Sequence, residues 1–131
     1  MMKAERNKTI DFELKDGMEY FNRCLSINKS VNIDEIINKT ICGDLFEVID
    51  NIPENSIDLI IADPPYNLDK NFHGNKFKKT SNDDYIEYTR SWIKKVAPLL
   101  KENGTIYVCC DWKCSGAIES VLKEFFIVQN A

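Results

Sequence analysis

The most regular pattern of apolar and polar residues begins at residue 40, where short apolar runs alternate with segments of helical periodicity. Residues 40–42 form a short β-type run, and Ile57–Ala62 form a longer one that is almost entirely apolar. A run of this kind predicts a central parallel strand that is buried on both faces. Residues 105–110 repeat the pattern, and residues 126–128 begin a further predicted strand.

Helical patterns lie between these predicted strands. Residues 45–52 repeat apolar side chains at helical spacing before a proline, and residues 112–126 do so near the end of the chain. Between them we predict a long helix that begins with Asp83 or Asp84 as its N-cap and ends at Asn103-Gly104. The polar segment 67–82 before this helix is interpreted as a loop.

The predicted order is strand, helix, strand, loop, helix, strand, helix and the start of a strand. This alternation with short connections predicts an α/β fold, with a mostly parallel sheet flanked by helices. Ligands of such sheets bind beyond the carboxyl ends of the strands. Three segments directly follow strands, so we expect them at one rim: Gly43-Asp44, residues 63–66 and Asp111-Trp112.

Residues 1–38 carry a weaker pattern and are interpreted as a helical N-terminal lead-in. Apolar residues predict a helix around residues 17–27, and Ser30 or Asn32 can cap a short second helix. The remaining residues, 39–131, contain all of the predicted strands. We therefore place a boundary between residues 38 and 39.

Composition is that of an ordinary globular domain. The chain has 131 residues, of which 44% are hydrophobic and 29% charged, and this length is enough to bury a core. The net charge of -4 argues against a protein that binds polyanions by bulk charge, although it allows a local basic patch. The apolar runs are too short to span a bilayer and the N-terminus lacks the apolar core of a secretory signal, so we expect a cytoplasmic protein.

Five cysteines are present, an odd number that does not suggest a disulfide framework. Cys110 and Cys114 have a spacing that could hold half of a metal site. The only histidine, His73, is distant in the sequence, and no second close cysteine pair exists. We therefore expect reduced thiols and no metal site.

The tetrapeptide Asp63-Pro64-Pro65-Tyr66 follows the most apolar predicted strand directly. Two prolines fix the backbone and remove two N–H donors, which leaves a carboxylate, carbonyl oxygens and an aromatic ring. Asp63 and the Pro64 carbonyl could each accept one N–H of an exocyclic amine while Tyr66 stacks on its ring. Two such acceptors would favour a pyramidal nitrogen, and the carboxylate would stabilise the positive charge that develops there.

With Cys42-Gly43-Asp44 upstream, the segment IDLIIADPPY (residues 57–66) resembles the DNA amino-methyltransferases that use S-adenosylmethionine. The order of motifs resembles the beta class of that family, and the likeness continues through KENGTIYV to about residue 128. The resemblance implies a Rossmann-like methyltransferase fold and a flipped DNA adenine as the substrate, methylated at N6. It implies that residues 39–131 are the catalytic half of such a domain.

The resemblance also implies the roles of individual residues. The tetrapeptide Asp63, Pro64, Pro65 and Tyr66 matches the catalytic motif. Asp44 and Leu45 match the position that holds the adenine end of the cofactor, and Asp63 also faces the cofactor. A role for Asp44 as the N-cap of helix 45–52 remains open beside the cofactor role.

The family also uses a glycine-rich FxGxG loop at the cofactor, and this chain has no two glycines at that spacing. We expect the chain to be the N-terminal portion of a longer enzyme that also has a target-recognition region. The expected activity of the isolated chain is low or nil. An unfinished sheet also predicts self-association or a complementing second chain.

A basic segment follows the tetrapeptide. Residues 70–79 contain no acidic residue and interleave two phenylalanines with His73 and with lysines that can contact DNA phosphates: Lys70, Lys76, Lys78 and Lys79. A solvated surface loop is the alternative interpretation of this segment.

Two alternatives to adenine-N6 methylation remain open. The same chemistry could act on another planar amine, such as cytosine N4, because only the resemblance connects Asp63 with adenine. The chain could also be a non-catalytic fragment that binds DNA or a partner, which the missing glycine-rich loop favours and the intact tetrapeptide disfavours.

Overall fold

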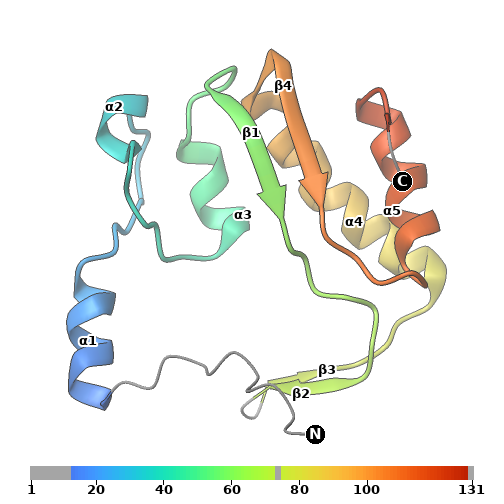
Figure 1. Ribbon diagram of the computed structural model, residues 1–131, viewed down its shortest axis with the longest axis horizontal. Helices are drawn as coiled ribbons and strands as arrows, with labels where there is room; N and C mark the ends of the chain where they lie inside the picture. Colours follow the sequence, from blue (N-terminus) through green and yellow to red (C-terminus); the bar gives the residue numbers. More distant parts are fainter. Residues whose placement is uncertain (1–12, 73–74, 130–131) are drawn as a thin grey trace, which may run out of the picture.

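Two parallel strands form the centre of the computed structural model, which describes residues 13–72 and 75–129 (Figure 1). β1 (Ile57–Ala62) pairs with β4 (Leu100–Val108), and Ile60 lies opposite Ile106 in the register. The predicted parallel arrangement is thus confirmed for these two strands. The mixed helix and strand order agrees with a partial Rossmann-like methyltransferase fold.

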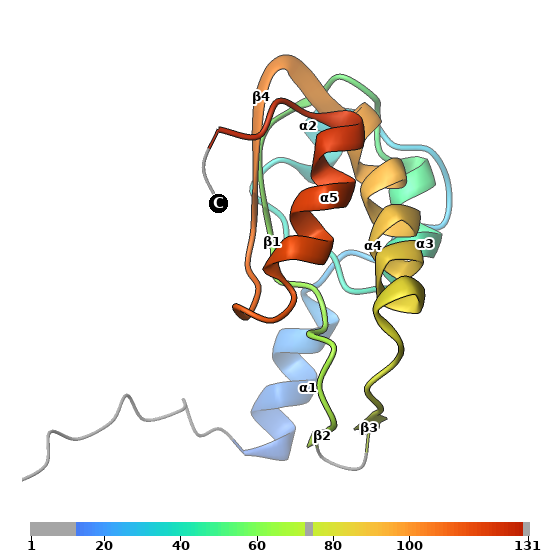
Figure 2. The same ribbon diagram turned by 90° about the vertical axis from the view of Figure 1, so that its right-hand side faces the viewer.

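Two helices cover one face of this sheet, α4 (Asn82–Val96) and α5 (Ser115–Phe125), as Figure 2 shows. Their apolar stripes meet in the core, where Ile93 of α4 and Val121 of α5 are completely buried. The inward side chains of both strands pack against this cluster, among them Ile60 and Ile106. Burial of these apolar side chains is the main source of stability for the layer.

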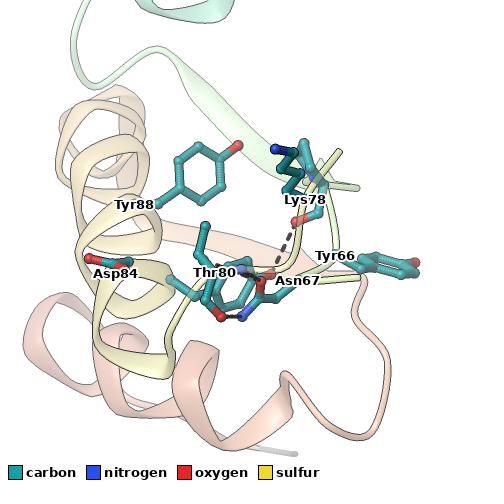
Figure 3. Close-up of a pocket in the computed structure, with 8 residues that line it drawn as sticks. Tyr66, Asn67, Lys78, Thr80, Asp84 and Tyr88 are labelled. Atoms are coloured by element: carbon teal, nitrogen blue, oxygen red, sulfur yellow. Dashed lines mark hydrogen bonds between the residues drawn. The ribbon is translucent and has the colours of Figure 1, made fainter. Parts of the chain in front are cut away.

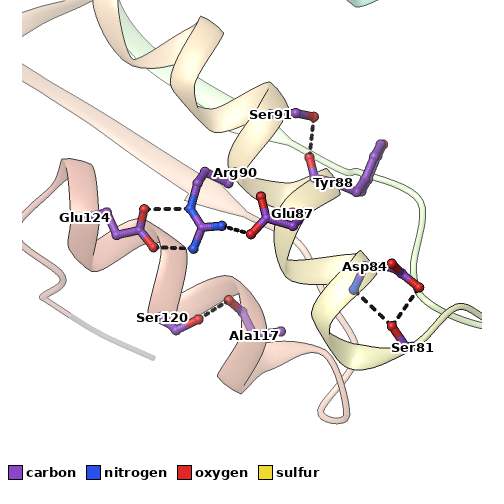
Figure 4. Close-up of polar contacts among 9 residues, drawn as sticks. All are labelled: Ser81, Asp84, Glu87, Tyr88, Arg90, Ser91, Ala117, Ser120 and Glu124. Atoms are coloured by element: carbon purple, nitrogen blue, oxygen red, sulfur yellow. Dashed lines mark hydrogen bonds and ion pairs between the residues drawn. The ribbon is translucent and has the colours of Figure 1, made fainter.

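An ion-pair group on the surface also joins the two helices (Figure 4). The Arg90 guanidinium donates to both carboxylate oxygens of Glu124, over 2.8 Å from Nε and 2.7 Å from Nη2, and it also pairs with Glu87. The two bonds to Glu124 fix the register between α4 and α5. Because these groups are partly exposed, their contribution to stability is small compared with the apolar core.

The second face of the sheet is open within the described residues. Leu59 and Ile61 of β1 and Tyr107 of β4 are 50%, 69% and 61% exposed. The prediction that Ile57–Ala62 is buried on both faces is therefore wrong for this part of the chain, because α4 and α5 lie on the same side.

Short elements surround the central layer. The N-terminal part contains α1 (Leu14–Asn22) and α2 (Ile33–Ile36), which confirms two predicted helices with shifted bounds. The predicted helix 45–52 is present as α3 (Leu45–Val48) followed by one 3-10 turn, η1 (Ile49–Asn51). The short run at residues 40–42 forms only an isolated parallel bridge, between Ile41 and Leu25, which joins the two sides of the predicted boundary.

The N-cap of the long helix differs from the prediction. The N-cap of α4 is Ser81, whose hydroxyl accepts a 3.1 Å hydrogen bond from the backbone N–H of Asp84. Asp83 and Asp84 thus lie in the first turn, where their negative charges interact favourably with the positive end of the helix dipole.

The end of the long helix also differs from the prediction. α4 ends at Val96, and a 3-10 turn with a proline, η2 (Ala97–Leu99), leads into β4. Asn103-Gly104 therefore lies inside a strand. A Cβ at Gly104 would lie 2.8 Å from Leu100 Cδ2 and 2.9 Å from the Lys101 carbonyl, so this glycine permits a close backbone approach where the strand register shifts.

Two further predictions, those for residues 67–82 and 126–128, are also corrected. The segment 67–82 contains a small antiparallel hairpin of β2 (Lys70–Phe72) and β3 (Asn75–Phe77). Residues 126–128 form no strand in the described part of the chain, although Phe126 has extended backbone angles. No helix in the described ranges is long and apolar enough to cross a membrane.

Candidate active site

The tetrapeptide Asp63–Tyr66 lies at the carboxyl end of β1, at the predicted rim of the sheet (Figure 1). Pairing with β4 continues to the last residue before it, because the Cys109 N–H donates to the Ala62 carbonyl over 2.8 Å. The two prolines cannot donate the next ladder bonds, so the chain turns out of the sheet. Asp63 is exposed at this corner, and Pro64 is half-buried.

The corner is held by side chains from the following elements. Tyr85, 5% exposed near the start of α4, donates a hydrogen bond from its hydroxyl to the Pro65 carbonyl over 3.2 Å. Burial and the neighbouring Cys114 raise the pKa of Tyr85 well above its ordinary value. The phenol therefore keeps its proton and acts as a donor at physiological pH.

Asn67 closes the loop that follows the tetrapeptide (Figure 3). Its Nδ2 donates to the Thr80 carbonyl over 3.1 Å, and its Oδ1 accepts from the Thr80 N–H over 2.8 Å. The amide thus pairs with the backbone of Thr80 as a neighbouring strand would. Its role was left open by the sequence, because the partner lies thirteen positions away.

Asp63 and Tyr66 contact each other across the turn. The Tyr66 hydroxyl donates to Asp63 Oδ1 over 2.9 Å, and this hydrogen bond is the largest cause of a raised Tyr66 pKa. In Figure 3 the Tyr66 ring points away from the Tyr88 ring. The tyrosine therefore orients one carboxylate oxygen while the second oxygen can accept from a substrate.

A cavity of about 350 Å³ lies beside the tetrapeptide, between the loop and α4. Its lining includes Pro65, Tyr66, Asn67, Lys78, Thr80, Asp84, Tyr85 and Tyr88. The sequence predicts both Tyr85 and Tyr88 as core residues, and this is confirmed for Tyr85 alone. Tyr88 is 37% exposed and forms a wall of the cavity.

Asp44 is the N-cap of α3, as one of its two interpretations predicts. Its Oδ1 accepts from the Phe46 N–H over 2.8 Å. Burial, and to a smaller extent the Asp44 carboxylate, raise the pKa of Tyr88. Its neighbour Leu45 is 47% exposed.

Asp111, at the third predicted rim segment, caps the turn before α5. Its Oδ1 accepts from the N–H groups of Lys113 and Cys114, and hydrogen bonds from Cys114 hold its pKa below the ordinary value. The sequence predicts core or rim packing for both tryptophans. Trp92 is buried in the core, whereas Trp112 beside Asp111 is 82% exposed.

The basic segment forms an arm next to the cavity. Lys70 lies in β2 and Lys76 in β3, and their backbones belong to the hairpin. Lys78 lines the cavity, and the Lys79 N–H donates to Asp69 Oδ1 over 2.9 Å. His73 lies outside the described residues. Within the ranges that are described, no group of three or more histidine, cysteine or acidic side chains could hold a metal ion.

Comparison with known proteins identifies the family. The DNA methylase family model matches residues 57–131, more than half of the chain and the part that contains β1, the tetrapeptide, α4 and β4. The chain belongs to the DNA methylase family. The recognition of an amino-methyltransferase from the sequence is thereby confirmed at the level of the family.

Three relatives show how similar this chain is to known methyltransferases. The type II methyltransferase M.HpaI of Haemophilus parainfluenzae is 36% identical over 86 residues, which are 66% of this chain and 27% of the relative. The type II methyltransferase M.HinfI of Haemophilus influenzae is 30% identical over 112 residues, 76% of this chain and 30% of the relative. The DNA adenine methyltransferase YhdJ of Escherichia coli K12 is 32% identical over 88 residues, 67% of this chain and 30% of the relative.

This methylase chain therefore spans only 27% to 30% of the length of these relatives. The matched part contains the tetrapeptide corner and the elements that hold it. The similarity supports the methylase fold of the part that is present.

The contact between Tyr66 and Asp63 predicts a specific pH dependence. The phenol hydrogen bond favours the protonated tyrosine, so Tyr66 should titrate above its ordinary value of 10.0, and Asp63→Asn should lower that pKa. The stabilisation of the folded chain by this hydrogen bond is present below pH 10, and it is lost as the pH rises through the raised pKa of Tyr66. The Cζ chemical shift of Tyr66 measured against pH gives the value directly.

Asp58→Asn is the matched control for this titration, because Asp58 lies at the other end of β1 and pairs with Lys101. This control should leave the titration of Tyr66 unchanged. Equal effects of the two substitutions would show that Asp63 does not hold the phenol.

Proposed function

We propose that this chain carries the methyl-acceptor part of a DNA adenine-N6 methyltransferase. The observation that supports it best is the Asp63–Tyr66 corner, which lies at the rim of a parallel sheet and is held by Tyr85 and Asn67. The corner offers a carboxylate and rigid carbonyls without competing N–H donors from the two prolines. That donor-free environment suits an exocyclic amine of a base extruded from the duplex.

In this proposal each residue of the corner has a separate task. Asp63 and the Pro64 carbonyl accept the two N–H groups of the adenine amine and direct its lone pair away from the ring. The Asp63 carboxylate stabilises the positive charge that develops on the nitrogen. Pro65 fixes the backbone, and Tyr66 orients Asp63 and offers its ring to the base.

S-adenosylmethionine is the proposed cofactor and supplies an electrophilic methyl group when bound. The residues present fit its adenine end, because Asp44 uses Oδ1 to cap α3 and its Oδ2 accepts no hydrogen bond in the described ranges. Asp44, with Leu45, is proposed to hold this end, and Asp63 to face the reactive end.

The active enzyme is proposed to need more of the family's sequence than the 131 residues contain. Two observations support this: the chain spans 27% of M.HpaI, and the apolar face around Leu59, Ile61 and Tyr107 is open. A parallel sheet is normally covered on both faces. The further part, in the same chain or in a second one, would cover this face and supply the glycine-rich cofactor loop.

The basic arm is proposed to contact DNA phosphates close to the extruded base. Lys78 and Lys79 are exposed beside the cavity, and the hairpin places Lys70 and Lys76 further along the same arm. Each lysine that neutralises a phosphate releases condensed counterions, so binding depends on salt.

Methyl transfer is tested in a chimera in which the 86 residues of this chain that match M.HpaI replace their counterparts in that enzyme. With S-adenosylmethionine and DNA of mixed sequence, nucleoside mass spectrometry should detect N6-methyladenine. Asp63→Asn should lower the rate by about 10²- to 10³-fold, because the developing charge loses its carboxylate. Asp58→Asn, at the far end of the same strand, should leave the rate unchanged.

Methylated cytosine as the sole product would contradict adenine as the substrate. Equal rates for Asp63→Asn and the unsubstituted chimera would contradict the role of the corner. The chain alone should transfer little or no methyl in the same assay, and a robust rate would contradict the need for further sequence.

DNA contact by the arm predicts a change in salt dependence. Lys78→Ala and Lys79→Ala should each reduce the slope of log affinity against log salt by about one unit. Fluorescence anisotropy of labelled duplex DNA at several salt concentrations measures this slope. The matched control is Lys94→Ala, an exposed lysine on α4, which should not change it; equal slopes for all variants would show that the arm does not bind phosphates.

A further inference from the structure

Trp112 presents a large aromatic ring to solvent just beyond the end of β4. The side chain is 82% exposed, whereas the other tryptophan, Trp92, is 3% exposed in the core. Single exposed apolar side chains are common on protein surfaces, so the surroundings of the ring decide whether it has a task. Three features of those surroundings point to a ligand: the turn that carries the ring, its place in the sheet and the neighbouring cation.

The turn that carries Trp112 is fixed from both sides. Asp111 Oδ1 accepts from the N–H groups of Lys113 and Cys114 over 3.1 and 2.9 Å. The Ser115 hydroxyl donates to the Trp112 carbonyl over 2.9 Å, and the Cys114 side chain is anchored in the core at 4% exposure. The chain therefore holds this backbone in one conformation, and a ligand of the ring would not have to order it.

The ring lies at the same rim of the sheet as the methyl-acceptor corner. Val108 is paired with Ala62 in the register, and the Cys109 N–H donates to the Ala62 carbonyl over 2.8 Å. Trp112 is the third residue after Cys109, so the two Cα atoms lie at most about 11 Å apart. Figure 1 shows the segments that follow β1 and β4 leaving the same end of the sheet. A ligand of the corner Asp63–Tyr66 therefore extends toward Trp112 if it is larger than one nucleotide.

A cation accompanies the ring. The Lys113 ammonium lies over the Trp112 ring, with Nζ 5.5 Å from the ring centroid, and the lysine is itself exposed. Since the indole is largely exposed, its other face is accessible to a planar group. An aromatic ring next to a cation is typical of sites for unpaired nucleotides, in which the ring stacks on a base and the cation attracts a phosphate.

The charge of Lys113 favours DNA over a protein segment as the partner of this ring. An apolar segment that covered Trp112 would also remove the neighbouring ammonium from water, which costs free energy unless an acidic group pairs with it. A DNA strand provides a planar base and a negative phosphate in each nucleotide. It therefore satisfies the ring and the ammonium together.

We infer that Trp112 stacks on a nucleobase of the substrate DNA beside the Asp63–Tyr66 corner, with Lys113 next to an adjacent phosphate. The inference rests on the proposed function, which makes DNA the substrate. It adds a base contact on the β4 side of the corner, whereas the basic arm on the other side is proposed to contact phosphates. Trp112 is then a substrate-binding residue.

The probe for this site is a short single-stranded DNA of mixed sequence, added to the full chain. It should shift the NMR signal of the Trp112 indole N–H and give contacts between base protons and the Trp112 ring. The Trp92 indole is an internal reference, because it is buried and its Nε1 has no hydrogen-bond partner in the described residues. An abasic strand of the same length, which carries phosphates without bases, should leave the Trp112 signal almost unchanged.

Substitutions separate the ring from the charge in the affinity for the same strand. Trp112→Ala should weaken binding about tenfold, because a base loses its stacking partner, and Trp112→Phe should keep most of the affinity. Lys113→Ala should reduce the slope of log affinity against log salt by about 0.7, the single-strand value for one phosphate. Tyr107→Ala is the matched control, since Tyr107 is an exposed aromatic residue within β4, and it should bind as the parent chain does. Fluorescence anisotropy of the labelled strand measures these affinities.

Four results would overturn the inference. They are the absence of contacts between base protons and Trp112, equal shifts with the abasic strand, equal losses in Trp112→Ala and Tyr107→Ala, and a Trp112 signal that shifts with chain concentration but not with DNA. The last result would show that a second copy of the chain covers the ring. The base contacts are measured on the unsubstituted chain, so the test holds even if a variant fails to fold.

The outcome is separable from that of the proposed function. Methyl transfer by the chimera, without base contacts at Trp112 in the full chain, would contradict the stacking role alone. Base contacts at Trp112 without methyl transfer by the chimera would contradict the proposed methylation alone.

Discussion

Two adjacent prolines after β1 impose the constraint on which the site depends. Neither Pro64 nor Pro65 can donate a backbone hydrogen bond, so the ladder with β4 ends at the bond from Cys109 to Ala62. Beyond that point the sheet cannot fix the chain. The Tyr85 hydroxyl and the Asn67 amide hold it instead, through the Pro65 carbonyl and the backbone of Thr80.

This constraint connects the core with the chemistry. Tyr85 can reach Pro65 because α4 is fixed against the sheet by Ile93 and against α5 by the Arg90–Glu124 pair. A hydrogen bond of this kind contributes about 1 kcal/mol net to stability, and here it is part-buried. The apolar core thus sets the position of a polar corner, and the corner presents Asp63 toward solvent.

The two central strands and the tetrapeptide that follows the first of them could be predicted because both are local in the sequence. The apolar run Ile57–Ala62, the periodicity of the helices and the two prolines each carry their own physical meaning. The predicted position of the α4 N-cap was wrong by two or three residues, because serine and aspartate are both good capping residues and Ser81, Asp83 and Asp84 lie close together. Gly104 was wrongly predicted to end the helix. In the sequence alone, a glycine that ends a helix cannot be told from one that permits a close backbone approach within a strand.

The contacts that complete the site could not be predicted in the same way. The partner of Asn67 is a backbone group thirteen residues away, and the bond from Tyr85 spans twenty residues. Tyr85 and Tyr88 share one helical stripe, so periodicity predicts both as core, and only the packing of the loop against α4 separates them. The open sheet face likewise depends on which side each helix takes, which hydrophobicity alone does not specify.

Contacts from beyond the tetrapeptide hold its loop in one conformation. Amide hydrogen exchange of Thr80 tests this most directly, because its N–H donates to Asn67 Oδ1 over 2.8 Å. This amide should be protected in the parent chain and should exchange freely in Asn67→Ala. The Ser56 amide, bonded to the Leu99 carbonyl at the opposite end of β1, should stay protected in both. Free exchange of the Thr80 amide in the parent chain, with Ser56 protected, would show that Asn67 does not hold the loop.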